Sequence, residues 1–167
     1  MKRAVVDTNV PIVANGRPDG ANGGGIASAK CRLAAVNFLD ELLKSGCVIL
    51  DLAGEIQGEY RRYLRPSGEP GVGDRFYHEV LRRGPPRVQL IELPKAPDGS
   101  YEDYPKDQGL AAFDPSDRKF VALSLRAKAP VIVATDSDWV EHKGALTRNG
   151  IRIKFLCGCD PKTWFGT

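Results

Sequence analysis

The chain has 167 residues, of which 42% are hydrophobic and 27% are charged, as in an ordinary globular domain. Its 24 basic and 21 acidic side chains leave a formal charge of +3, which is too small to predict a polyanionic partner from bulk charge alone. The apolar run behind Met1-Lys2-Arg3 is broken by Asp7, which excludes a secretory signal or a membrane span there, so we expect one cytoplasmic domain over residues 1–167.

The first third of the chain predicts two strands and one long helix. Residues 2–6 have the pattern of a strand, and the glycine-rich stretch 11–27 has the pattern of an irregular loop. Ser28 is a suitable cap for a helix over residues 28–45, because apolar residues recur there at steps of three and four. The next strand, 47–50, leads directly into Asp51.

The remaining chain alternates between helices and strands. Helices are predicted at 55–64, at 74–83, from Asp114-Pro115 to just before Pro130, and at about 138–148. Strands are predicted at 88–93, 131–134 and 151–155, with a second irregular stretch at 94–113. Such alternation favours a parallel sheet with helices on both faces, that is, a three-layer α/β/α fold with a central sheet of about five strands.

The four cysteines do not predict a metal site. Cys31, Cys47, Cys157 and Cys159 contain no Cys-x-x-Cys pair, so a zinc site is not expected. We interpret them as four unpaired thiols in a reducing cytosol.

Several common catalytic motifs are missing from the sequence. No glycine is followed by Lys-Ser or Lys-Thr, and neither Gly-x-Gly-x-x-Gly after a strand nor Gly-x-Ser-x-Gly occurs. The two histidines, His78 and His142, are not in a metal-ligand spacing. The chemistry of this chain is therefore expected to depend on carboxylates.

Acidic residues follow two of the predicted strands. Asp7 comes directly after Ala4-Val5-Val6, and Asp136 comes after the strand 131–134, while Asp117 lies in the first turn of the preceding helix. The carboxyl ends of parallel strands meet at one edge of a sheet, where ligands bind. Several acids at this edge would repel one another unless a divalent cation such as Mg²⁺ or Mn²⁺ held them together.

The order of these motifs resembles that of PIN-domain nucleases. Four motifs carry the resemblance, which spans residues 4 to about 156: Asp7-Thr8-Asn9, Glu59-Tyr60-Arg61-Arg62-Tyr63-Leu64, Asp117-Arg118-Lys119-Phe120 and Thr135-Asp136-Ser137-Asp138-Trp139. PIN domains have a three-layer α/β/α fold and act as metal-dependent ribonucleases. The resemblance implies that the following acids are catalytic and hold Mg²⁺ or Mn²⁺: Asp7, Glu59, Asp117 and Asp136.

The resemblance also assigns the surrounding residues. Asp138 would be an additional metal-site acid, and the supporting polar residues would be Thr8, Asn9 and Thr135. Glu55 lies on the same helix face as Glu59, so either could point inward, and the motif favours Glu59. Basic residues near the acids could hold RNA phosphates without reading sequence, foremost Arg61, Arg62, Arg118 and Lys119.

The function implied is hydrolysis of phosphodiester bonds in single-stranded RNA by an endoribonuclease. The toxin half of a toxin–antitoxin pair is one role consistent with the resemblance, with an antitoxin protein and a second copy of the chain as partners besides RNA. A non-catalytic PIN-like module that binds RNA or a protein is the alternative. Phosphatases of the haloacid type need an acid where this chain has Asn9, and receiver domains need an acidic pair that is missing here.

Each acid also has a purely structural explanation. Asp117, Asp136 and Asp138 could cap helices, and Asp114 is interpreted as a cap. Glu59 could be a solvated acid that pairs with Arg61 or Arg62. Asp7 could form an Asx turn, since no helix is predicted directly after it.

Overall fold

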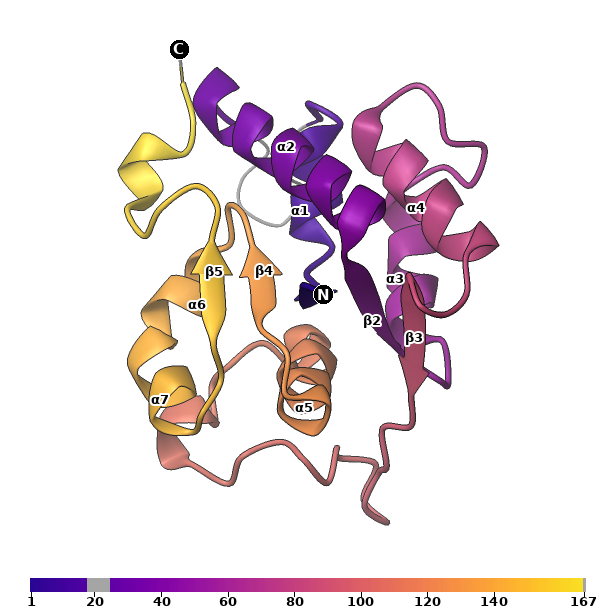
Figure 1. Ribbon diagram of the computed structural model, residues 1–167. Coiled ribbons are helices and arrows are strands. Elements are labelled where there is room, and N and C mark those ends of the chain that lie inside the picture. Colours follow the sequence, from indigo (N-terminus) through magenta and orange to yellow (C-terminus); the bar gives the residue numbers. More distant parts are fainter. Residues whose placement is uncertain (18–24, 167) are drawn as a thin grey trace.

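The protein is an α/β domain built around one parallel sheet. The structure, a computed structural model, describes residues 1–17 and 25–166 (Figure 1). The sheet has five strands, all parallel, in the order β3-β2-β1-β4-β5. Their bounds are β1 (Arg3–Val6), β2 (Cys47–Asp51), β3 (Val88–Ile91), β4 (Val131–Val133) and β5 (Ile153–Phe155).

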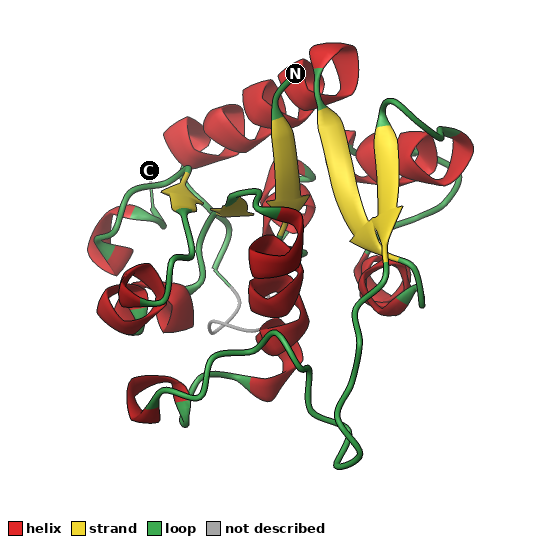
Figure 2. Ribbon diagram, turned by 60° about the horizontal axis from the view of Figure 1, so that its bottom comes forward, coloured by secondary structure: helices red, strands yellow, loops and turns green. Residues whose placement is uncertain are grey.

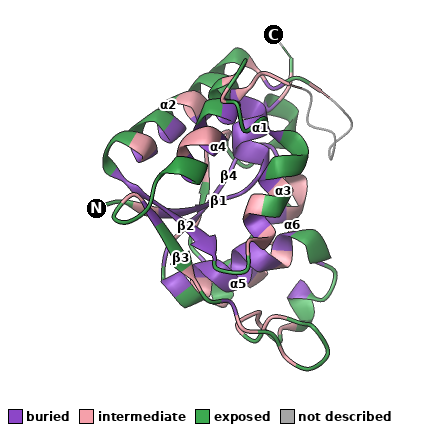
Figure 3. Cartoon of the chain, turned by 90° about the vertical axis from the view of Figure 1, so that its right-hand side faces the viewer, coloured by how far each residue is buried: buried purple, intermediate pink, exposed green. Residues whose placement is uncertain are grey.

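Helices cover both faces of the sheet and complete a three-layer α/β/α sandwich. The α-helices are α1 (Asn9–Ala14), α2 (Ala29–Ser45), α3 (Glu55–Tyr63), α4 (Val72–Arg82), α5 (Arg118–Ala127), α6 (Ser137–Glu141) and α7 (Lys143–Arg148). Short 3-10 turns are η1 (Gln108–Leu110), η2 (Pro115–Asp117) and η3 (Pro161–Thr163). Helices α1, α2 and α4 pack together, and Figure 3 shows the strands between this group and α5. Among the described residues, every helix is too short or too polar to cross a membrane.

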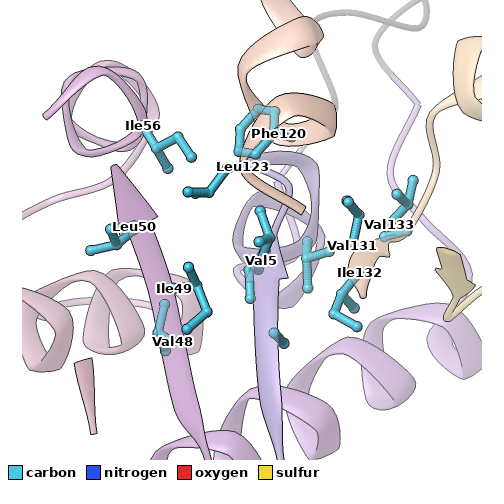
Figure 4. Close-up of a cluster of buried hydrophobic side chains, with 14 of the residues drawn as sticks. Val5, Val48, Ile49, Leu50, Ile56, Phe120, Leu123, Val131, Ile132 and Val133 are labelled. Carbon is cyan, nitrogen blue, oxygen red and sulfur yellow. The ribbon is translucent and has the colours of Figure 1, made fainter. Parts of the chain in front are cut away.

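The strands supply the central part of the hydrophobic core. Val5, Ile49 and Val133 are fully buried, and Phe120 and Leu123 of α5 pack onto the same cluster (Figure 4). Burying one large apolar side chain stabilises a fold by about 1.5–3 kcal/mol. The short runs of β-branched residues in β1, β2 and β4 are therefore explained by burial on both faces of the sheet, as expected for parallel strands.

The strand order places a topological switch point between β1 and β4. The chain moves from β1 outward through β2 to β3, and then crosses back to β4 on the other side of β1. Asp7 directly follows β1 and Asp136 lies three residues beyond β4, so both are carried to the same sheet edge. This is the crevice in which open α/β sheets bind ligands.

One helix was not expected from the sequence. The prediction of an irregular loop from residue 11 is wrong for its first part, because α1 begins at Asn9 and contains Pro11. Proline is tolerated there because the first-turn N–H groups of a helix have no intrahelical acceptor. The prediction that no helix directly follows Asp7 is also wrong. Thr8 is the N-cap of α1, and the Asp7 carbonyl oxygen accepts a hydrogen bond from Val10 N at 3.0 Å. Residues 18–24 of the predicted loop lie outside the described residues.

The other elements differ from the predictions mainly at their ends. The helix expected at 138–148 is two helices, α6 and α7, separated at His142. The helix expected from Asp114 begins with the 3-10 turn η2 before α5, and Asp114 caps it by accepting from Ser116 N at 2.9 Å. The long connection from β3 to α5 is an extended loop outside the sheet, interrupted by η1 (Figure 2).

The prediction of four unpaired thiols is wrong. Cys31 of α2 and Cys157, which follows β5, form a disulfide across a sequence separation of 126 residues, with a Cα–Cα distance of 5.0 Å. Cys47 is a buried free thiol and Cys159 an exposed one. Local spacing could not reveal this pair, because the fold alone brings α2 beside the C-terminal segment. The argument for a reducing cytosol loses the support of the unpaired thiols.

We expect reduction of this disulfide to lower the free energy of unfolding by about 2–4 kcal/mol, because a cross-link that closes a long loop restricts the unfolded chain. Denaturant unfolding with and without dithiothreitol measures the loss, and Cys157→Ser should reproduce it without reductant. Cys159→Ser is the matched control and should leave stability unchanged. Alkylation of all four cysteines in the unreduced, denatured protein would contradict the prediction.

Candidate functional site

An acidic cavity of about 340 Å³ opens at the switch point between β1 and β4. Its lining comes from four parts of the chain: the end of β1 with α1, helix α3, turn η2 and the residue that caps α6. The lining residues are Asp7, Thr8, Asn9, Ile12, Glu59, Tyr63, Asp114, Ser116, Asp117 and Asp136. The structure thus brings together all four acids that the sequence motifs single out as catalytic.

Asp7 is the most deeply buried acid of the cavity. It is 2% exposed, and its Oδ2 atom is buried with no hydrogen-bond partner among the described residues. Burial, followed by the charges of Asp117, Asp136 and Glu59, raises the pKa of Asp7 well above its ordinary value. A buried ionised carboxylate oxygen without a partner is costly unless water or a cation satisfies it.

Asp117 lines the same cavity and has similar surroundings. It ends η2, directly before α5, and is 7% exposed. Burial, together with the neighbouring charges of Asp136, Asp114 and Glu59, raises the pKa of Asp117 to about 8. Lys119 opposes these effects at both Asp7 and Asp117. The cluster is therefore short of positive charge.

Asp136 and Asp138 have different surroundings. Asp136 lines the cavity and also caps α6 by accepting from Asp138 N at 3.0 Å, so its helix-capping role does not remove it from the cavity. Asp138 is not among the lining residues. Its carboxylate accepts from Asp114 N at 2.8 Å and lies 3.1 Å from His142 Nδ1. Asp138 thus braces the η2 and α6 segments that carry the site.

The choice between Glu55 and Glu59 is resolved by their contacts. Glu55 accepts from Lys95 Nζ at 2.6 Å and from Tyr101 Oη at 2.8 Å, and it points to the loop after β3. Glu59 lines the cavity, accepts a hydrogen bond from the Thr8 hydroxyl and lies 3.4 Å from Lys119 Nζ. The pairing of Glu59 with Arg61 or Arg62 that we considered is absent among the described contacts.

Polar side chains tie the strand ends together. Asn9 Nδ2 donates to Thr135 Oγ1 at 3.0 Å, and Thr135 N donates back to Asn9 Oδ1. Both residues are buried, so this pair fixes the start of α1 against the end of β4. Thr8 joins the start of α1 to α3 in the same way, because its hydroxyl donates to the Glu59 carboxylate. The three residues predicted as support thus join segments that carry the cavity acids, and their role in metal binding stays a prediction.

Sequence reasoning missed one buried hydroxyl beneath the site. Tyr60 is fully buried, and its Oη donates to the carbonyl oxygen of Val6, the residue before Asp7. Burial, with the charges of Asp7 and Glu59, raises the pKa of Tyr60 well above its ordinary value, so it remains a neutral donor. The sequence shows Tyr60 next to Glu59. It does not show that the Tyr60 ring points inward, because this orientation depends on packing against Phe76 and Tyr77 of α4.

The predicted substrate-binding residues lie in distinct settings. Arg61 and Arg62 are exposed on α3, and Arg62 lines a second hollow of about 370 Å³ that shares Glu59 and Ser116 with the acidic cavity. Arg118 donates through Nη2 to the carbonyl oxygens of Ala111 and Phe113 at 3.0 and 3.1 Å. Lys119 is buried beside Glu59. Of the four, the two α3 arginines face solvent.

The residues of the cavity fit a divalent cation. Its donors are carboxylate and amide or hydroxyl oxygens, which are the ligands that Mg²⁺ and Mn²⁺ prefer. The buried Oδ2 of Asp7 has no hydrogen-bond partner among the described residues, and this free oxygen is compatible with a cation ligand. Asp7, Asp117 and Asp136 would hold such an ion.

Asp51 lies at the end of β2 but serves another purpose. It is buried, and its two carboxylate oxygens accept from Glu55 N and Ile56 N at 2.8 and 2.9 Å. Asp51 therefore caps α3 and is satisfied without a ligand.

Comparison of the chain with protein-family models, with curated proteins and with solved structures finds no match in any of the three.

Proposed function

We propose that this protein is a PIN-type nuclease that cleaves single-stranded RNA with the help of Mg²⁺ or Mn²⁺. The single observation that carries the proposal is the buried, unpartnered Oδ2 of Asp7 in a cavity shared with Glu59, Asp117 and Asp136. Cavities of this kind accept a hard cation, and the fold presents it at the edge where α/β sheets bind ligands.

The proposed reaction is hydrolysis of a phosphodiester bond. When bound, the cation lowers the pKa of the attacking water and offsets charge on the phosphate. Asp7, Asp117 and Asp136 would hold this cation from three segments of the chain, and the Asn9–Thr135 pair fixes the Asp7 segment to the Asp136 segment. Ser116 and Tyr63 also line the cavity, and the Tyr63 side chain is 51% exposed. A nucleotide that enters the cavity would contact both.

The second hollow supports a path for the RNA backbone. It adjoins the acidic cavity through Glu59 and Ser116 and carries the exposed guanidinium of Arg62. A phosphate held there would be attracted without sequence readout, so binding should weaken with salt.

We expect the purified protein to shorten a labelled, unstructured RNA when Mn²⁺ or Mg²⁺ is added and to leave it intact in excess EDTA, because the acids alone repel phosphate. Gel electrophoresis of the products measures this. A matched duplex of the same sequence is the control and should be cut more slowly. Equal cleavage with EDTA would contradict metal dependence.

The alternative is a PIN-like module that binds RNA or a protein without cutting. It predicts RNA retention with chelator and no shortened product with any divalent ion. The presence of all four acids in one cavity favours catalysis over this alternative. A toxin role, an antitoxin partner and a homodimer follow from the sequence resemblance alone and stay predictions.

A further inference from the structure

Lys119 brings a buried positive charge to the edge of the acidic cluster. The residue is 8% exposed, and its Nζ donates to the Ser116 carbonyl oxygen and lies 5.0 Å from the centre of the Phe120 ring. A buried ammonium is costly unless it is paired and hydrogen-bonded. Here the partner is Glu59 Oε1, 3.4 Å from Nζ.

Glu59 is consequently satisfied on both carboxylate oxygens. Thr8 donates its hydroxyl to Oε2, and Lys119 lies beside Oε1. Asp7 differs, because its Oδ2 is buried with no partner among the described residues. Within the acidic cluster, the carboxylate of Glu59 thus has a positively charged partner, whereas the buried Oδ2 of Asp7 has no partner among the described residues.

This asymmetry bears on the number of cations. In a two-ion phosphodiester site the metals stand roughly 3.5–4 Å apart and share a ring of carboxylates. A second ion on the Glu59 side would have to approach an ammonium that already holds this carboxylate, and the like charges repel. An ion beside Asp7 meets three carboxylates, those of Asp7, Asp117 and Asp136.

We propose that Lys119 is the resident counter-ion of Glu59 and restricts the cavity to a single divalent cation, held by Asp7, Asp117 and Asp136. This inference rests on the proposed function, because it assumes that the cavity binds a metal. Lys119 acts as a positioning residue: it keeps Glu59 on the Thr8 side of the cavity and does not touch the metal.

The test is the number of Mn²⁺ ions bound per chain, measured from the free Mn²⁺ signal in electron paramagnetic resonance. The wild-type protein should bind about one ion, and Lys119→Gln about two, since the loss of the ammonium frees Glu59 for a second ion. Lys119→Arg keeps the charge and should again bind about one. Lys44→Gln is the matched control, because Lys44 pairs with Asp40 on the exposed side of α2, outside both the acidic cavity and the second hollow, and should not change the number.

The outcomes are distinguishable. Two ions on the wild-type protein would overturn the inference while leaving the proposed nuclease intact, and one ion on correctly folded Lys119→Gln would overturn the role of Lys119. No ion on the wild-type protein would overturn the proposed function itself. If Lys119→Gln does not fold, as judged by circular dichroism, the wild-type and Lys119→Arg numbers still decide whether one ion is the limit.

Discussion

Asp7→Asn is expected to lower the rate of Mn²⁺-dependent RNA cleavage by about a hundredfold to a thousandfold, the size of effect seen when one strong electrostatic stabiliser of a transition state is removed. The amide removes the charge at the deepest point of the cavity, where Oδ2 has no partner within the described chain. Initial rates on a labelled single-stranded RNA, at saturating Mn²⁺, measure the change.

The same substitution should not destabilise the metal-free protein. Burial and the charges of Asp117, Asp136 and Glu59 already disfavour the ionised form of Asp7 in the native state, so a neutral side chain of the same size is tolerated. Asp40→Asn is the matched control: Asp40 is on α2, forms a surface ion pair with Lys44 and should affect neither rate nor stability. Unchanged cleavage by correctly folded Asp7→Asn would exclude this cavity as the site.

The fold and the clustering of the acids could be predicted because both depend on local patterns. Short runs of β-branched residues alternate with amphipathic helices, and this alternation is sufficient to predict a parallel sheet. An acid that directly follows such a run is carried to the carboxyl edge of the sheet wherever the strand lies. Asp7 and Asp136 could therefore be placed together before their strands were known to be neighbours.

The roles of individual acids depended on contacts that are distant in sequence. Asp7 directly follows β1 and Asp51 is the last residue of β2. Gly54, with a φ of +82°, turns the chain after β2 so that α3 directs two N–H groups at Asp51. No comparable donor reaches Asp7 Oδ2 among the described residues. Glu55 is drawn away by Tyr101 and Lys95 of the irregular stretch, whose path no periodicity predicts.

The second large effect is a dependence of stability on pH. The folded-state pKa values of Asp7 and Asp117 are raised, that of Asp117 from 3.8 to about 8. In the unfolded chain these acids lose their protons near pH 4, whereas the native protein retains them. The stability of the native protein is therefore highest with respect to these two acids below about pH 4. It falls as pH rises to about 8, because over this range only the unfolded chain gains by losing the protons.

We therefore expect EDTA-treated protein to lose about 3 kcal/mol of unfolding free energy between pH 5.5 and 8.5 through Asp117 alone, measured by urea unfolding. The lowered pKa values of Glu55 and Asp107 affect stability only at more acid pH, outside this range. Asp117→Asn should flatten the dependence, and Asp40→Asn should leave it unchanged.

A divalent cation should reverse this loss, because it binds the ionised acids of the native state and replaces the protons that they otherwise keep. At pH 8.5, Mn²⁺ at a hundredfold excess over its dissociation constant should restore about 2.7 kcal/mol. The gain should shrink at pH 5.5, where protons compete for Asp7 and Asp117. A Mn²⁺ effect that is equal at both pH values would show that these acids are not the metal ligands. Stability that rises from pH 5.5 to 8.5 in EDTA would contradict their raised pKa values.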